Sequence, residues 1–167
     1  MELFHGSDIE VRKPQLLATN RTLDFGRGFY TTTSRQQAVD FTKNVNRRNG
    51  STDGIVSVYE LDDEKAVSLN ILKFAAADET WLDFVMKNRL KKIIEPKFDI
   101  VIGAVANDNV FTTLILYADG TITKQETLAR LKTKRLFDQY AFQSEKALSF
   151  LEYKHSFKVE GVNTNDK

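Results

Sequence analysis

The sequence predicts an α+β domain built on antiparallel sheets. Expected strands and helices follow one another without the regular strand–helix–strand alternation of a parallel sheet. Of the 167 residues, 41% are hydrophobic and 28% are charged, which is the ordinary range of globular proteins. Only two prolines interrupt the chain. We expect a single domain over residues 1–160, followed by a polar tail over residues 161–167.

The first part of the chain is expected to contain two short strands and a long helix. Residues 2–5 are largely apolar and precede a Gly-Ser turn signal, which predicts a strand. Residues 29–33 are aromatic or β-branched, which predicts a second strand. Ser34 is a typical N-cap, so we expect a helix over residues 35–48. Its apolar face, at helical spacing, comprises Ala38, Phe41 and Val45.

A loop and further strands and helices are expected after this helix. Residues 49–54 are Asn, Gly, Ser, Thr and Asp, which favour a loop, and residues 55–61 alternate as a half-buried strand does. Residues 98–105 form a nearly continuous apolar run, which predicts a central strand buried on both faces. The other expected strands are residues 66–73, 139–142 and 152–159. The other expected helices are residues 79–92, 110–117, 124–132 and 144–151.

The composition excludes several kinds of site. The chain has no cysteine, which excludes disulfides, thiol catalysis and cysteine-ligated metal centres. Its two histidines, His5 and His155, are too few for a His-rich metal site, so we expect no metal. A net charge of +1 gives no overall reason to expect nucleic acid or a membrane as partner. The first residues lack the features of a signal peptide, so we expect a cytoplasmic protein that does not bind a membrane.

The most informative segments are Leu3-Phe-His-Gly-Ser7 and Asp24-Phe-Gly-Arg-Gly-Phe-Tyr-Thr-Thr-Thr-Ser34. Each is a short, partly apolar run that places a polar or aromatic residue beside glycine. A glycine next to a strand lets a ligand approach the backbone, because it has no Cβ atom. The pattern indicates a binding site formed by these two segments.

Together with the later segment Asp138-Gln-Tyr-Ala-Phe142, these runs resemble the ADP-ribosyltransferase superfamily, in its diphtheria-toxin and PARP-like branch with a His-Tyr-Glu triad. In that branch a first strand ends in His-Gly, as His5-Gly6 does. A Gly-Lys/Arg-Gly run leads into a strand that carries a tyrosine, as Tyr30 does. The third position begins a late strand, and Gln139 stands where glutamate is usual.

The chain also resembles a bacterial group of uncharacterised, toxin-like proteins in this superfamily. The shared features are the Phe-Gly-x-Gly-Phe-Tyr-Thr-Thr run, a central Asp-x-Val-x-Gly segment at residues 99–103, and a closing segment at residues 139–148. The resemblance therefore covers nearly the whole chain. It implies split antiparallel β-sheets with flanking helices, and NAD bound as a co-substrate in the cleft between the sheets.

The resemblance assigns His5, Tyr30 and Gln139 as the catalytic residues. In the family, the histidine holds the nicotinamide-side ribose, the backbone of the next glycine, here Gly6, pairs with the carboxamide, and the tyrosine faces the nicotinamide ring. A neutral imidazole can donate from one nitrogen and accept at the other, which suits the first role. An aromatic face attracts the cationic nicotinamide by about 1 kcal/mol, which suits the third.

Three further residues are candidate NAD contacts, each with a structural alternative. Gly28, like Gly26, could line the cleft or serve a tight turn that needs positive φ. Arg27 could meet the NAD phosphates, because a guanidinium suits them, or it could be an ordinary surface cation. Phe41 could pack over the nicotinamide from the helix or fill the core.

Gln139 is the main departure from the family pattern. Breaking the bond between ribose and nicotinamide passes through an oxocarbenium-like state, which a carboxylate stabilises. The Gln139 amide can accept a hydrogen bond from a ribose hydroxyl, but it carries no charge and cannot act as a general base. We considered two carboxylates as substitutes. Asp108 follows the central strand and is preferred, whereas Glu145 suits the solvent-facing first turn of a helix.

Two clusters of basic residues have structural explanations. Lys87, Arg89, Lys91 and Lys92 lie near the end of a predicted helix, where cations complement the helix dipole. Arg130, Lys132, Lys134 and Arg135 precede Gln139, where the superfamily commonly contacts its acceptor. That second cluster could bind an acidic or nucleic-acid target, or be a solvated helix end.

The function implied by the resemblance is transfer of ADP-ribose from NAD to an unknown protein or nucleic-acid acceptor. A toxin or effector paired with an antitoxin protein would be a suitable setting. Three alternatives remain open: an NAD glycohydrolase in which water is the acceptor, a binding module for NAD or ADP-ribose without turnover, and RNA 2'-phosphotransferase chemistry, which would need several arginines around the cleft.

Overall fold

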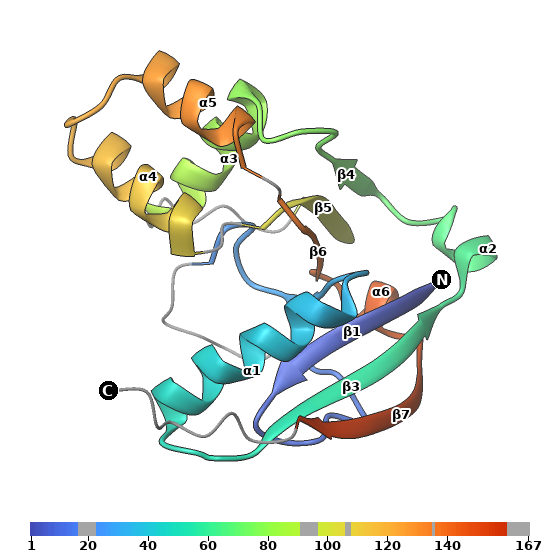
Figure 1. Ribbon diagram of the computed structural model, residues 1–167. Coiled ribbons are helices and arrows are strands. Elements are labelled where there is room, and N and C mark those ends of the chain that lie inside the picture. The colour runs from blue at the N-terminus through green and yellow to red at the C-terminus, as the bar shows by residue number, and fades with distance from the viewer. Residues whose placement is uncertain (17–22, 91–96, 106–107, 135, 160–167) are drawn as a thin grey trace.

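Two β-sheets with helices packed on their outer faces make up the fold (Figure 1). The computed structural model describes residues 1–16, 23–90, 97–105, 108–134 and 136–159, and gives only the backbone of residues 108 and 109. The architecture confirms the predicted α+β class.

The first sheet has three strands in the order β1-β3-β7, and both pairings are antiparallel. Its strands are β1 (Glu2–Ser7), β3 (Gly54–Leu61) and β7 (Leu151–Val159). Helix α1 (Arg35–Asn49) packs against one face, as Figure 1 shows, and begins where Ser34 caps the backbone N–H of Gln37. The small core between them consists of Phe4, Ala38, Val56 and Val58.

The second sheet has four strands in the order β2-β6-β5-β4. They are β2 (Phe29–Thr31), β6 (Asp138–Phe142), β5 (Ile100–Ala104) and β4 (Ile71–Lys73). As predicted, β5 is a central strand. The expectation of purely antiparallel sheets is wrong for β4 and β5, which pair in parallel. The physical reason is that helix α3 lies between them in the chain, and such a crossover returns the chain in the same direction.

Three helices cover one face of the four-stranded sheet: α3 (Glu79–Arg89), α4 (Asp108–Ala118) and α5 (Lys124–Lys132). Figure 1 shows them gathered on the side away from the three-stranded sheet. The core under them includes Phe25, Trp81, Val85, Val101 and Ala141. The other face of the sheet packs toward the three-stranded sheet through Phe29, Ile100 and Phe142, which meet Leu3 and Tyr59.

Most predicted elements are confirmed, and the differences between prediction and structure lie at the ends of the elements. The strand expected over residues 66–73 is confined to β4, because Asp62 caps the short helix α2 (Asp63–Ala66) just before it. The helix expected over residues 144–151 is also one turn, α6 (Glu145–Leu148), since β7 begins at Leu151. Helix α3 ends at Arg89, and residues 91–92 and 161–167 lie outside the described residues.

No helix in the described ranges is long and apolar enough to cross a membrane.

Candidate functional site

The two sheets meet at a single bridge between β1 and β2. The N–H of Phe4 donates to the carbonyl of Thr32 (2.8 Å), and the N–H of Thr32 donates to the carbonyl of Phe4 (3.0 Å). Alternate residues of a strand direct their N–H and C=O groups to the same side. Gly6 lies two positions after Phe4, and Tyr30 lies two positions before Thr32, so the backbone groups of Gly6 and Tyr30 point into the same gap. In the described part of the chain the bridge is not continued there. We call this gap, bounded by Gly6 and Tyr30, the β1/β2 split.

His5 reaches across the β1/β2 split. Its Nδ1 lies 2.7 Å from the carbonyl oxygen of Tyr30, and its ring lies against Phe29 with centroids 4.4 Å apart. Because a carbonyl can only accept, Nδ1 carries the hydrogen, and the Nε2 of the neutral ring is left as an acceptor. Burial lowers the pKa of His5, and the hydrogen bond to Tyr30 offsets this only in part. The imidazole is therefore neutral at pH 7.

Gly6 is required by the packing of α1. A Cβ atom on Gly6 would lie 2.1 Å from the carbonyl oxygen of Ala38, which is a severe clash. The helix thus rests directly on the backbone of β1. This structural role leaves the N–H and C=O of Gly6 directed into the split, since they lie along the edge of the strand and not on its face.

The glycines of the second motif have two different structural reasons. Gly26 has a φ of 85°, which confirms the turn alternative at that position. For Gly28 the same alternative is wrong, because it has no positive φ. A Cβ atom there would lie 2.8 Å from the carbonyl oxygen of Phe142, so Gly28 lets this segment approach β6. Its predicted contact with NAD stays a prediction.

Phe41 lies on the flank of α1 that overhangs the split. Arg35 of α1 lies over the ring of Phe157 in β7 (4.3 Å), and Phe41 is six residues further on, about 240° around the helix. Since β7 and β1 are opposite edges of the sheet, this flank lies over the free edge of β1. Phe41 is 38% exposed, so the expectation that it fills the core is wrong, and the guanidinium of Arg48 lies 5.5 Å from the centre of its ring. Gln37 shares the flank, and its Oε1 is buried without a partner in the described residues.

Tyr30 has a structural role that the sequence did not predict. Its hydroxyl donates to the carbonyl of Gly26 (2.6 Å) and accepts from the N–H of Phe25 (3.1 Å), which closes the turn before β2. Burial raises the pKa of the Tyr30 phenol, and the nearby Asp24 carboxylate raises it further. The phenol therefore stays protonated and fixed. Its stacking on nicotinamide remains a prediction.

Gln139 is buried on the helix-covered face of the second sheet, at 7% exposure. Its Nε2 lies 3.4 Å from Oδ2 of Asp24 and 3.3 Å from the carbonyl oxygen of Ala104. It faces Gly103 of β5 in register. A Cβ atom on Gly103 would lie 2.9 Å from the ring of Phe25, so this glycine makes room for the aromatic core beside Gln139.

The carboxylate beside Gln139 belongs to Asp24, which the sequence analysis did not propose. Asp24 forms an ion pair with Arg89, whose Nε and Nη2 lie 2.8 and 2.5 Å from Oδ1. Their side chains are 11% and 18% exposed. Glu145 is exposed in the first turn of α6, as expected, and the side chain of Asp108 is outside the described part. Asp24 opens the glycine motif, which was the one signal that could have found it.

The remaining basic candidates lie at the surface. Arg27 is exposed and donates to the carbonyl of Leu16 (2.5 Å), which confirms its position as a surface cation and leaves a phosphate contact as a prediction. Lys132 and Lys134 are exposed beside a hollow of about 580 Å³ that also touches Phe74 and Phe137. Arg135 lies outside the described residues.

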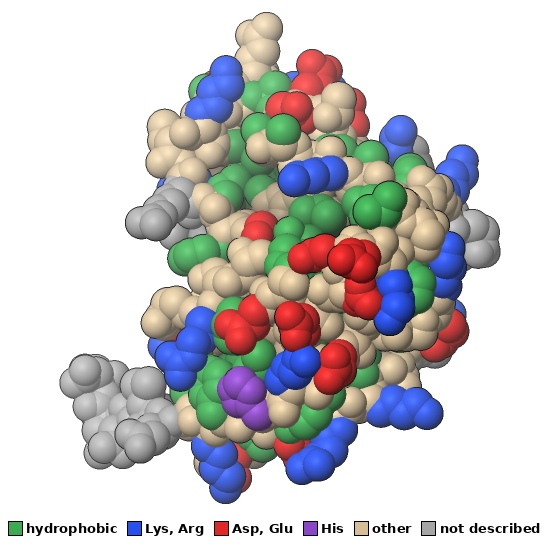
Figure 2. Space-filling view, turned by 90° about the vertical axis from the view of Figure 1, so that its right-hand side faces the viewer, with side chains coloured by type: hydrophobic (Ala, Val, Ile, Leu, Met, Phe, Trp, Pro, Cys, Tyr) green, Lys and Arg blue, Asp and Glu red, His purple; other side chains and the backbone are tan. Residues whose placement is uncertain are grey.

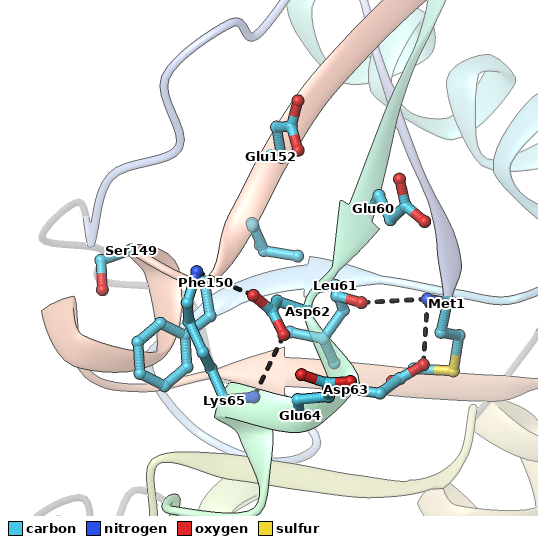
Figure 3. Close-up of a pocket in the computed structure, with 11 residues that line it drawn as sticks. Met1, Glu60, Leu61, Asp62, Asp63, Glu64, Lys65, Ser149, Phe150 and Glu152 are labelled. Atoms are coloured by element: carbon cyan, nitrogen blue, oxygen red, sulfur yellow. Dashed lines mark hydrogen bonds and ion pairs between the residues drawn. The ribbon is translucent and has the colours of Figure 1, made fainter.

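A second hollow, of about 640 Å³, lies at the end of the three-stranded sheet. Figure 2 shows acidic side chains gathered across the middle of one face of the molecule, and this hollow is lined by Glu60, Asp62, Asp63, Glu64 and Glu152 among others. In Figure 3 the α-amino group of Met1 donates to the carbonyl of Leu61 (2.9 Å) and to Asp63 (3.1 Å). These carboxylates largely serve structural contacts.

Neither hollow includes His5, Tyr30 or Gln139. The structure instead links the three through one segment: His5 bonds the backbone of Tyr30, and residues 24–26 join the Tyr30 phenol to Gln139. His5 and the Tyr30 backbone lie at the narrow split, whereas Gln139 lies on the packed face of the second sheet. Neither of the two hollows lies between these residues. Among the described residues, no cluster of three or more His, Cys, Asp or Glu side chains could hold a metal ion.

Comparison with known proteins gives a family without an assigned activity. No curated protein matches the chain. The model of one family, described as "Protein of unknown function (DUF3990)", matches residues 1–153, which is most of the chain. This protein is therefore a member of the DUF3990 family.

Proposed function

We propose that this protein binds NAD at the β1/β2 split and transfers ADP-ribose from it to a protein or nucleic-acid acceptor, with release of nicotinamide. The observation that carries the proposal is the backbone of Gly6, whose N–H and C=O point into the split beside Tyr30. A carboxamide offers one acceptor and two donors in one plane, so it can bond both groups of one residue. Nicotinamide carries such a carboxamide.

The state of His5 supports the same occupant. The nicotinamide ring of NAD is cationic until it leaves, so a charged imidazole beside it would oppose binding. Burial lowers the pKa of His5 and keeps the ring neutral, with Nε2 free to accept from a ribose hydroxyl in the tautomer that Tyr30 fixes. The histidine therefore orients the ribose without repelling the ring.

The overhanging flank of α1 supplies the other side of the proposed site. The exposed ring of Phe41, which lies 5.5 Å from the Arg48 guanidinium, offers apolar surface, and the Oε1 of Gln37, buried without a partner among the described residues, offers an acceptor. Burying an amide oxygen without a partner costs about 1–3 kcal/mol, and a ligand donor would recover that free energy. Both features suit a ligand with an aromatic ring and N–H or O–H donors.

A binding module without turnover is the second candidate, and one observation favours it. Gln139 is buried and uncharged where catalysis needs negative charge beside the ribose. In that case the split would hold NAD or ADP-ribose and the bond to nicotinamide would stay intact. A glycohydrolase differs from the transferase only in using water as the acceptor. The pairing with an antitoxin is proposed on the resemblance alone.

Incubation with NAD labelled in its adenylate part, with and without a cell lysate, tests these functions. We expect released nicotinamide, and label on a protein or nucleic-acid fraction when lysate is present. Nicotinamide without bound label would indicate hydrolysis, and calorimetric binding of NAD without nicotinamide would indicate the module. His5→Ala should abolish the reaction, whereas His155→Ala, which removes the exposed histidine of β7, should not. Absence of both NAD binding and turnover would overturn the proposal.

A further inference from the structure

Arg89 of helix α3, Asp24 and Gln139 form a polar triad in which Gln139 is buried and the two charged side chains are partly buried. Arg89 directs two N–H groups to Oδ1 of Asp24, and Oδ2 faces the Gln139 amide. The position of Asp24 is fixed further, because the side chain of Asn88 donates to its backbone carbonyl (3.1 Å). The guanidinium of Arg89 lies 4.7 Å from the centre of the Phe111 ring. Asp24 and Arg89 are therefore held in place by neighbours from α3 and α4, and Gln139 is held by Asp24 and the backbone of β5.

The orientation of the Gln139 amide follows from its partners. Oδ2 of Asp24 and the carbonyl of Ala104 can only accept hydrogen bonds, so the amide nitrogen faces both of them. Its Oε1 then points away from these two acceptors. A hydrogen bond to a carboxylate polarises an amide and makes its oxygen a better acceptor.

A glutamate at position 139 would conflict with this arrangement. Its carboxylate would meet Oδ2 of Asp24 and the carbonyl of Ala104 with no hydrogen to share. Two carboxylates so close cannot both ionise easily, and one of them would take up a proton. The glutamine is therefore matched to Asp24, which already supplies the negative charge of this cluster.

We infer that Asp24 acts through Gln139 as the charge source of the reaction, an inference that rests on the proposed function. When the bond between ribose C1' and nicotinamide breaks, its electron pair leaves with the neutral nicotinamide, and positive charge develops on the ribose. On this inference the polarised Oε1 of Gln139 is the group directed to that charge. An acceptor hydroxyl then bonds to C1' and releases its proton to solvent. Gln139 is the catalytic residue, and Asp24 is its positioning residue.

Exchange of the two groups tests the inference. Asp24→Asn removes the charge, and Gln139→Glu places two carboxylates together. The double variant restores one carboxylate and one amide in exchanged positions, with the carboxylate one side chain further from Arg89. We expect kcat for nicotinamide release to fall by about 100-fold in each single variant and to recover in the double variant, with little change in KM for NAD. Urea midpoints should fall and recover in the same order.

Gln36 and Asp40 provide a matched control. They form the same pair, with Nε2 of Gln36 3.1 Å from Oδ2 of Asp40, but on the exposed side of α1. Asp40→Asn, Gln36→Glu and their combination should leave nicotinamide release unchanged and show no recovery pattern. If the wild type is active but kcat of the double variant is no higher than that of either single variant, the inference is overturned and the proposed function is not. A wild type that neither binds nor consumes NAD overturns the proposed function and the inference with it, and the urea midpoints still report the coupling of the two residues.

Discussion

The β1/β2 split and the Arg89–Asp24–Gln139 triad are built by different means. The split consists of backbone groups at the edges of two short strands, with a glycine and one histidine. The triad consists of two charges and an amide from three distant segments, with side chains at most 18% exposed. The split can accept a ligand without unpairing any internal bond, whereas the two charged groups of the triad are already paired with each other. Recognition and charge are thus located in separate regions joined by Tyr30.

The largest expected effect comes from breaking the triad. Arg89→Met should lower the free energy of unfolding by about 3–5 kcal/mol, because it leaves the Asp24 carboxylate buried without its cation. Urea unfolding measures the change. Arg130→Met, in the exposed last turn of α5, is the control and should stay within about 0.5 kcal/mol of the wild type. A loss below about 1 kcal/mol at Arg89 would mean that the triad is not a buried ion pair.

At the split, stability should depend on the volume of the side chain at position 6. Gly6→Ala should cost about 1–3 kcal/mol of unfolding free energy, since the new methyl group would force α1 away from β1. Gly50→Asn is the comparison, because asparagine tolerates its φ of 68° and nothing lies within 4 Å of its Cβ position. Similar midpoints for the two variants in denaturant would argue against the direct packing of α1 on Gly6.

Acid should act on the split through His5. Its pKa is lowered in the folded state, so the unfolded chain binds the proton first as the pH falls through about 6.5. Stability should then decrease by up to about 1.4 kcal/mol for each further pH unit, down to the lowered pKa. His5→Gln should remove this share of the slope between pH 7 and pH 5 in thermal melts, and His155→Gln should not. A slope unchanged in His5→Gln would place the acid sensitivity elsewhere.

The smallest effect on stability is expected at the rim of the split. Phe41→Ala should change the unfolding free energy by less than about 1 kcal/mol, because the ring is already 38% exposed. NAD affinity measured by calorimetry should nevertheless fall about fivefold, which corresponds to the loss of one aromatic contact. Ile115→Ala on α4, which is 47% exposed, should leave NAD affinity as it is. Equal affinities for the two variants would remove Phe41 from the site.

Local signals predicted most of the fold. Ser34 was identified as an N-cap, and it caps α1 in the structure; the helix predicted over residues 124–132 is α5. The apolar run at residues 98–105 was placed as a central strand, and β5 lies between β6 and β4. Caps and hydrophobic runs depend on neighbours in the chain, so they can be recognised without knowing the tertiary structure. The parallel pairing of β4 with β5 depends on where the intervening helix packs, and the sequence pattern did not reveal it.

The sequence predicted only those residues of the candidate site that stand in short motifs. His5, Gly6 and Tyr30 stand in short motifs, and the structure brings the first two to the same gap as the Tyr30 backbone. Asp24 and Arg89 are 65 positions apart in sequence, and their pairing is a property of the folded chain. Arg89 was explained by the helix dipole, which is a sufficient local reason. The carboxylates predicted near Gln139 were Asp108, which follows the central strand, and Glu145, six residues beyond Gln139, and no signal in the sequence around Gln139 pointed to Asp24.

The most direct test of the account is the response of the Gly6 amide to NAD. In a titration of ¹⁵N-labelled protein with NAD, followed by NMR, the Gly6 N–H resonance should shift in a saturable way, together with that of Tyr30. Nicotinamide alone should shift the same two resonances more weakly. Shifts confined to the hollow beside Lys132 and Lys134, with Gly6 unmoved at saturation, would contradict the claim that the β1/β2 split binds the nicotinamide end of NAD.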